Sequence, residues 1–263
     1  MVNNLIIVFV LTMIIHTAET LSYSVRYAGV KINKITVALA LTGIIVLVSR
    51  TANLIQAPLT AKFVDFAKDN PSFDLMSYLR IIILASSVGT LIAIALFPTF
   101  VNIFVRVISK LEVAGSLPKL ITSVTIGQLR NTKYYIKKPS FKIHQFRYLG
   151  IPKRFLLLNV VVTAFYTIGV LSSLYAAHLL PGLSTTASQA SGLINGIATI
   201  ILTIFIDPQL GLITDKALHN EESRNKLGKI YVLLMVSRFF GTMLAQLVII
   251  PAAYLISMIV KLI

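Results

Sequence analysis

The sequence contains no cysteine and few charged residues. The absence of cysteine excludes a disulfide framework, thiolate metal ligands and a cysteine nucleophile. Charged residues make up 13% of the 263 residues, whereas hydrophobic residues make up 56%, and the mean hydropathy is +0.85. A soluble domain of this length needs far more polar surface than this composition supplies. The composition therefore predicts an integral membrane protein.

The usual signatures of enzymatic chemistry are also missing. The sequence contains no carboxylate pair at catalytic spacing, no metal-ligand cluster and no glycine-rich phosphate loop. Its four histidines are scattered along the chain, which argues against a zinc site or a histidine-based triad: His16, His144, His178 and His219. We therefore expect a protein that is not an enzyme and needs no cofactor.

Six apolar stretches are long enough, or nearly long enough, to cross a bilayer. A hydrocarbon core of about 30 Å needs about 20 apolar residues in a helix. The stretches cover residues 4–24, 35–55, 79–105, 155–180, 188–206 and 230–260. Pro98 and Pro251 are expected to kink the third and sixth helices or to mark their ends. The sequence thus predicts an all-α bundle of six transmembrane helices in one transmembrane domain, residues 1–263.

Positive charge is concentrated between the third and fourth spans. Eleven of the 24 basic residues lie in the segment 106–154, against Glu112 alone, and the connections after spans one and five are also basic. The positive-inside rule places these three loops in the cytoplasm and both termini outside. Basic residues that flank apolar spans favour anionic phospholipids as partners and argue against nucleic acid. The long loop is either an interfacial amphipathic helix or a solvated linker.

Short motifs recur at offsets of 152 to 154 residues. Leu41-Thr-Gly43 matches Ile194-Asn-Gly196, and the pair Gly89-Thr90 matches Gly241-Thr242, whereas spans one and four share little. The motifs predict a repeat of three spans, residues 1–105 and 155–263. An odd number of spans forces the second copy to enter the membrane from the opposite side. Such a 3+3 inverted repeat is typical of alternating-access transporters, although channels also contain inverted repeats.

Ionisable side chains interrupt the apolar spans. They are Glu19, Arg50, Asp207 and Arg238, with His16 one helical turn before Glu19. A charge at the centre of a membrane helix costs roughly 2.5–3.5 kcal/mol, so it usually serves a function. Asn53 shares a helix face with Arg50 and is the repeat partner of Asp207. These residues predict a polar cavity within the membrane.

The expected span boundaries place these groups at different depths. Glu19 and Arg238 are expected about 8 and 12 Å from the cytoplasmic ends of their spans, and Arg50 about 22 Å away. The arginines would then be successive stations along a path. Purely structural roles remain open for every residue: a Glu19–Arg238 ion pair that fixes packing, arginines that reach head groups, an interfacial cap at Asp207, and a packed His16.

Several stretches resemble the Amj family, and the resemblance covers essentially the whole chain. They are Ile14-Ile-His-Thr-Ala-Glu-Thr-Leu-Ser22 and the segments 49–62, 110–119 and 206–216. The resemblance implies a bacterial plasma-membrane protein that moves lipid II, an undecaprenyl-pyrophosphate-linked disaccharide-pentapeptide, from the inner to the outer leaflet. Members of the family stand in for the unrelated MurJ-type flippases. The resemblance assigns no site residues.

Residue chemistry then suggests how such a substrate is held. The planar fork of arginine suits a diphosphate, so Arg50 and Arg238 are expected to bind the pyrophosphate. Glu19, Asn53, Asp207 and His16 would orient the arginines or contact sugar. Homodimerisation, or a groove that stays open, would accommodate the large head group. Two alternatives remain: an ion- or proton-coupled exporter of small amphipathic solutes that uses His16 and Glu19, and a scaffold for cell-wall enzymes.

Overall fold

The computed structural model describes residues 1–116, 119 and 150–263. Six helical segments within these residues are long and apolar enough to cross a membrane. They are α1 (Val2–Lys31), α2 (Ile35–Asp69), α3 (Leu75–Ala114), α6 (Lys153–Leu179), the segment Pro181–His219 and α10 (Glu221–Leu262). The prediction of a helical bundle with six candidate spans is therefore confirmed. Most of the segment 113–129, for which an interfacial helix and a solvated linker were both open, lies outside the described residues.

The fifth segment is interrupted but remains helical almost throughout. It comprises η3 (Pro181–Leu183), α7 (Ser184–Gln189), α8 (Ser191–Ile201), η4 (Leu202–Ile206) and α9 (Asp207–His219). A π-helical turn in η4 precedes Pro208, which cannot donate a backbone hydrogen bond. The chain thus passes Asp207 and continues as helix for about three further turns.

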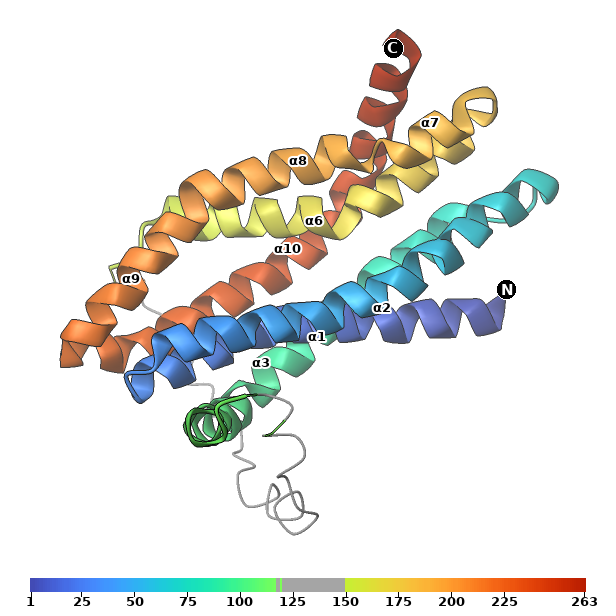
Figure 1. Cartoon of the computed structure of the whole chain (residues 1–263). Coiled ribbons are helices and arrows are strands. Elements are labelled where there is room, and N and C mark those ends of the chain that lie inside the picture. Colours follow the sequence, from blue (N-terminus) through green and yellow to red (C-terminus); the bar gives the residue numbers. More distant parts are fainter. Residues whose placement is uncertain (117–118, 120–149) are drawn as a thin grey trace.

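Prolines do not end the long helices. Pro58, Pro98 and Pro251 all lie inside helices, in α2, α3 and α10. Figure 1 shows α3 and α10 changing direction along their length, as expected where a proline removes one backbone hydrogen bond. The expectation that Pro98 or Pro251 might terminate a span is wrong, because packing on neighbouring helices holds both halves of each helix in place.

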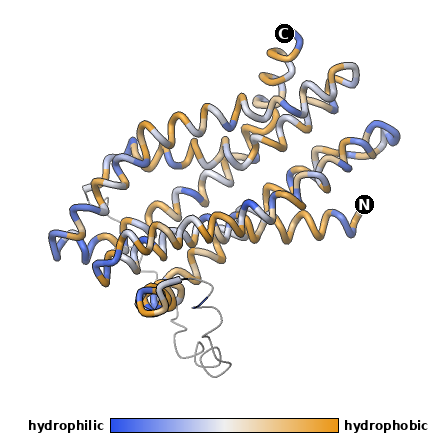
Figure 2. The backbone as a smooth tube through the Cα atoms, in the orientation of Figure 1, coloured by the Kyte–Doolittle hydropathy of each residue, from blue (hydrophilic) through white to orange (hydrophobic). Residues whose placement is uncertain are grey.

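The helices form two groups of three segments (Figure 1). In the first group, α1 packs against both α2 and α3; in the second group, α6 packs against both α8 and α10. The groups meet mainly where α10 packs against α3 and α1. Figure 2 shows hydrophobic residues along the helices and hydrophilic residues at many of the turns, the pattern of a bundle embedded in lipid. Large apolar side chains on the outer surface include Leu47, Leu54, Leu212 and Leu247.

The α1–α2 and α9–α10 connections, the end of α3 and the start of α6 lie at one end of the bundle, which we call the basic end, and both termini lie at the other (Figure 1). Lys34 Nζ pairs with Glu112 Oε1 at 2.5 Å and joins the α1–α2 turn to the end of α3. Arg224 Nη2 donates to Asn33 Oδ1 at 3.3 Å and joins the same turn to α10. The basic connections and the termini therefore lie at opposite ends of the bundle, as the charge pattern requires.

Glycines allow a close backbone crossing in each group. A Cβ atom on Gly89 of α3 would lie 2.4 Å from the carbonyl oxygen of Met13 in α1. A Cβ atom on Gly241 of α10 would lie 2.6 Å from the carbonyl oxygen of Val160 in α6. Thr17 Oγ1 adds a hydrogen bond of 2.9 Å to the Gly89 carbonyl. These are the small-residue contacts by which membrane helices approach closely.

Replacement of Gly89 by alanine is expected to destabilise the protein by about 1–3 kcal/mol, because backbone atoms of α1 must move to admit the methyl group. Gly43 is the matched control, since a Cβ there would meet nothing within 4 Å. Thermal unfolding of the purified protein in detergent measures the effect. Equal melting temperatures for Gly89→Ala and Gly43→Ala would contradict the close crossing.

Candidate functional site

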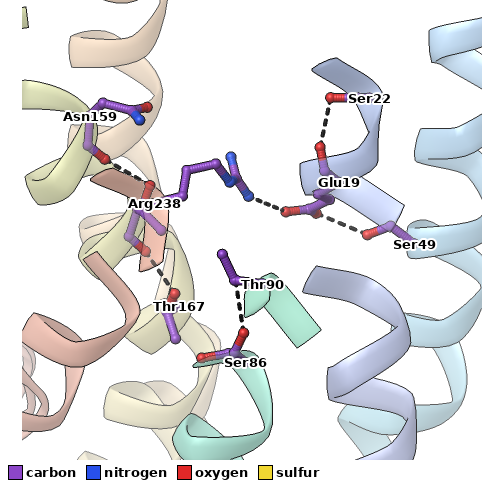
Figure 3. A network of polar contacts seen from close by, with 9 residues as sticks. Glu19, Ser22, Ser49, Ser86, Thr90, Asn159, Thr167 and Arg238 are labelled. Atoms are coloured by element: carbon purple, nitrogen blue, oxygen red, sulfur yellow. Dashed lines mark hydrogen bonds and ion pairs between the residues drawn. The ribbon is translucent and has the colours of Figure 1, made fainter. Parts of the chain in front are cut away.

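A half-buried carboxylate joins the two helix groups (Figure 3). Glu19 of α1 accepts a hydrogen bond from Ser49 Oγ of α2 at 2.9 Å on Oε1. Its other oxygen, Oε2, accepts from Arg238 Nη2 of α10 at 3.2 Å. The Arg238 side chain is 19% exposed and the Glu19 side chain 36%. Three helices from both groups thus converge on one ion pair.

The α1 sequence places polar groups along a single helix face. Thr12, His16, Glu19, Tyr23 and Arg26 follow one another in steps of three and four residues, so they lie in one stripe. The antiparallel helix α2 faces this stripe in a fixed register. Ser49 bonds Glu19, and seven residues later Gln56 Nε2 donates to Thr12 Oγ1 at 3.1 Å. Polar contacts between α1 and α2 therefore extend over two helical turns.

Arg238 is held in place by the packing of α10 on α6. The buried amide of Asn159 in α6 donates to the Leu234 carbonyl at 3.0 Å and to Ser237 Oγ at 2.6 Å. Ser237 immediately precedes Arg238, and Gly241 makes the close crossing one turn later. The α6–α10 contact thus fixes the backbone from which Arg238 reaches toward α1 in Figure 3.

His16 lies beside the ion pair. Its ring is buried, it precedes Glu19 by one turn, and Nδ1 has no hydrogen-bond partner among the described residues. The Nε atom of Arg238 is likewise buried without a partner. A fully hydrogen-bonded packing histidine, one expectation from the sequence, is therefore not what the structure contains.

The other three expected site residues lie near the ion pair in depth but not in contact with it. Arg50 and Asp207 are exposed and Asn53 is half-buried. None of the three has a hydrogen bond or ion pair with another described residue. The α1–α2 register places Asn53 beside His16, and Arg50 follows the buried Ser49 directly. The structure brings together Glu19, Arg238 and His16, and leaves Arg50, Asn53 and Asp207 around them.

The expected difference in depth is wrong. Glu19 lies twelve residues before the end of α1, which is about 18 Å from the basic end, and Arg50 lies fifteen residues after the start of α2, about 22 Å. Measured in the same way along its own helix, the distance from the basic end is about 18 Å for Asp207 and about 25 Å for Arg238. The direct contact of Ser49 with Glu19 confirms that Arg50 and Glu19 share one level. Asp207 is the first residue of α9, which continues to His219, so it lies farther from the basic end than expected.

The arrangement can hold an anion and can exchange it. Glu19 and Arg238 neutralise each other, so an anionic ligand that binds Arg238 must displace the carboxylate. The positive charge of Arg50 lies at the same level on the exposed side of α2. Sequence reasoning missed Ser49, because its place opposite Glu19 depends on the rotation of α2 against α1, and the Thr12–Gln56 contact that fixes this rotation appears only in the folded bundle.

Comparison with known proteins identifies the family of the chain. The family model Amj, described as "Alternate to MurJ", matches residues 11–260. The chain belongs to the Amj family. Lipid II flippase Amj of Bacillus subtilis (strain 168) is 38% identical over 262 residues, which cover 98% of this chain and 97% of that relative. No solved structure matches the chain. The family resemblance inferred from the sequence is thereby confirmed.

A double-mutant cycle tests the ion pair at the centre of the site. Glu19→Gln leaves the Arg238 guanidinium without a counter-charge and is expected to lower the melting temperature in detergent. Arg238→Gln in the same chain should restore part of the loss, with a coupling energy of about 1 kcal/mol because both side chains are partly exposed. The exposed pair Lys34–Glu112 is the control and should couple less strongly. Additive effects of Glu19→Gln and Arg238→Gln would contradict the pair.

Proposed function

We propose that this chain is a lipid II flippase of the bacterial plasma membrane, a transporter that carries out no covalent chemistry. One observation carries the proposal: near full-length similarity to a protein named as a lipid II flippase. The six candidate spans and the ion pair between helix groups agree with it. The substrate would cross from the inner to the outer leaflet for peptidoglycan synthesis, with its isoprenoid tail in lipid.

We further propose that the two helix groups are inverted repeats that alternate access. In Figure 1, α1 leaves the end that holds the termini, whereas α6 leaves the basic end. The close crossings correspond at similar offsets: Gly241 lies 152 residues after Gly89, and its contacts Val160 and Thr163 lie 147 and 150 residues after Met13. Inverted groups joined by a narrow contact suit a rocking motion.

The helix starts support the same correspondence. Asp74 caps α3 by accepting from the Ser77 amide at 3.2 Å, and Asn220 caps α10 by accepting from the Ser223 amide at 3.0 Å. Each cap thus pairs with a serine three residues later, as capping geometry requires. These caps lie at opposite ends of the bundle, as an inverted relation demands.

The proposed binding step is an exchange of anions at Arg238. A diphosphate offers several oxygens to a guanidinium fork and competes with the one contact that Glu19 makes. Arg50 would supply a second fork at the same level, on the exposed side of α2. Glu19, released from Arg238 but still bonded to Ser49, would then contact sugar hydroxyls with Asn53 and Asp207. Two copies of the chain, or a groove open to lipid, would admit the head group.

Complementation of a strain depleted of its MurJ-type flippase tests the binding step. Arg238→Ala and Arg50→Ala should each abolish growth, because a diphosphate loses a charge-assisted contact, while the protein still accumulates in the membrane. Lys68→Ala, which removes an exposed positive charge near the end of α2, should leave growth unchanged. Full growth with both arginine variants would refute the proposed pyrophosphate contacts and leave the family assignment intact.

A second function, proton-coupled export of small amphipathic solutes, is supported by the unpartnered Nδ1 of buried His16 beside Glu19 and Arg238. Buried imidazoles and carboxylates often form proton relays in membranes. Liposomes that contain the protein and fluorescent lipid II separate the two functions. We expect leaflet exchange of lipid II by the unaltered protein. Solute export driven by a pH gradient and lost in His16→Gln, with no lipid II exchange, would favour the second function.

A further inference from the structure

A regular seam between α1 and α10 leads from the basic end to the ion pair. The helices run antiparallel, and contacts recur at matching intervals: Arg224 with Asn33, Gly228 with Tyr27, Tyr231 with Tyr23, and Arg238 with Glu19. The residue numbers in each pair sum to between 254 and 257, so the register is constant along the seam. Arg224 and Arg238 are separated by fourteen residues, or about 21 Å of helix.

Both seam arginines on α10 have partners. Arg224 donates from Nη2 to the Leu218 carbonyl at 2.8 Å and from Nε to the Ala217 carbonyl at 3.2 Å, and it also reaches Asn33. Arg238 is paired with Glu19. These contacts give each of the two guanidinium groups a local role in joining helices.

Arg26 lies between these two arginines and differs from both. It follows Glu19 by seven residues on the same face of α1, about 10 Å closer to the basic end. The side chain is partly exposed, while its Nε atom is buried without a hydrogen-bond partner. Arg26 has no hydrogen bond or ion pair with any other described residue. A full positive charge therefore lies in the seam without a neutralising group in the described part of the chain.

The neighbouring side chains cannot neutralise Arg26 either. The charge of Arg26 interacts electrostatically with Tyr231, a fully buried residue. The Tyr231 hydroxyl lies 2.9 Å from Thr214 Oγ1. Thr214 Oγ1 donates its own hydrogen to the Leu210 carbonyl at 2.7 Å, so the tyrosine is the donor between the two hydroxyls. The Tyr231 oxygen is then a neutral acceptor and carries no charge that could neutralise Arg26. The site thus has one cation and a rigid aromatic wall formed by Tyr23 and Tyr231, whose ring centroids are 5.5 Å apart.

We propose that Arg26 binds the diphosphate of the polyprenyl-linked substrate before that diphosphate reaches Arg238. This inference rests on the proposed flippase function. Arg26 lies five residues from the end of α1, about 8 Å from the basic end, which is the depth of head-group phosphates if that end is cytoplasmic. The Arg26 guanidinium can bind phosphate oxygens bidentately. The next guanidinium along the seam is that of Arg238, which pairs with Glu19 about 10 Å farther along α1 from the basic end. The seam therefore forms a loading path with Arg26 as its first station.

Binding and transport by Arg26→Gln test this assignment in nanodiscs and liposomes made from zwitterionic lipid. We expect the dissociation constant for lipid II to rise about tenfold, as for loss of one charge-assisted contact. The concentration of lipid II at half-maximal exchange should rise in parallel, while the maximal rate stays near that of the unaltered protein. Lys229→Gln is the matched control: by register Lys229 lies at the same level on α10, but its side chain is exposed.

Three further arms make the result decisive. Arg26→Lys keeps the charge but loses the fork, and it should restore part of the affinity. Polyprenyl diphosphate without sugar should compete with lipid II at Arg26, whereas phosphatidylglycerol should not. Competition by phosphatidylglycerol that disappears in Arg26→Gln would identify a general phospholipid site and overturn the assignment to substrate. A thermal unfolding midpoint equal to that of Lys229→Gln excludes a folding defect.

Failure of this inference is distinguishable from failure of the proposed function. If Arg238→Ala abolishes exchange and Arg26→Gln matches the unaltered protein in both affinity and rate, Arg26 is not a station on the path. If the unaltered protein moves no lipid II, the proposed function itself fails. A loss of maximal rate in Arg26→Gln at saturating lipid II would also overturn the loading role, because a first station affects occupancy alone.

Discussion

The ion pair of Glu19 and Arg238 is the interaction on which the arrangement of the two helix groups depends. Each partner comes from a different group, and the Ser49 hydroxyl extends the contact to a third helix. Two opposite charges in an apolar slab attract strongly, yet removing them from water costs nearly as much, so such a pair adds little net stability. Its consequence is specificity, because the groups have one relative position at which both charges are satisfied. A second position requires another partner for Arg238.

The rest of the structure keeps that pair in a narrow geometric range. Backbone contacts at Gly89 and Gly241 fix α3 on α1 and α10 on α6, so each group behaves as a unit. Between the groups, Ser87 Oγ donates to Thr242 Oγ1 at 2.9 Å, and Gln246 Nε2 donates to the Arg80 carbonyl at 2.9 Å. The contacts within groups include backbone packed on backbone, whereas the groups meet through side chains: hydrogen bonds, the Glu19–Arg238 ion pair and apolar contacts such as Tyr23 with Tyr231. This contrast is what a rigid-body movement of one group against the other requires.

The sequence predicted the number and type of elements well, because apolar runs and the helix-packing glycines are local signals. It predicted depth poorly. Hydropathy locates only the apolar part of a helix, whereas α1 continues through Arg26 to Lys31 and α9 continues from Asp207 to His219. The extra turns place Glu19 and Asp207 farther from the basic end than the expected span boundaries did. The same error hid Arg26, which falls after the expected end of the first span and so read as a loop residue.

In the proposed function, Glu19 would also allow the site to release a bound diphosphate. If Arg238 had no internal partner, the full free energy of its interaction with the substrate would contribute to binding. The substrate would then be held tightly in either orientation of the helix groups. Here the substrate gains only the difference between its contacts and those of Glu19, since the carboxylate takes Arg238 back when the phosphate leaves. Ser49 keeps the carboxylate in place during the exchange, so recapture needs movement of the arginine side chain alone. In this proposal, an internal anion at this level would convert a binding site into one through which substrate passes, and it would return the two helix groups to the position that the ion pair specifies.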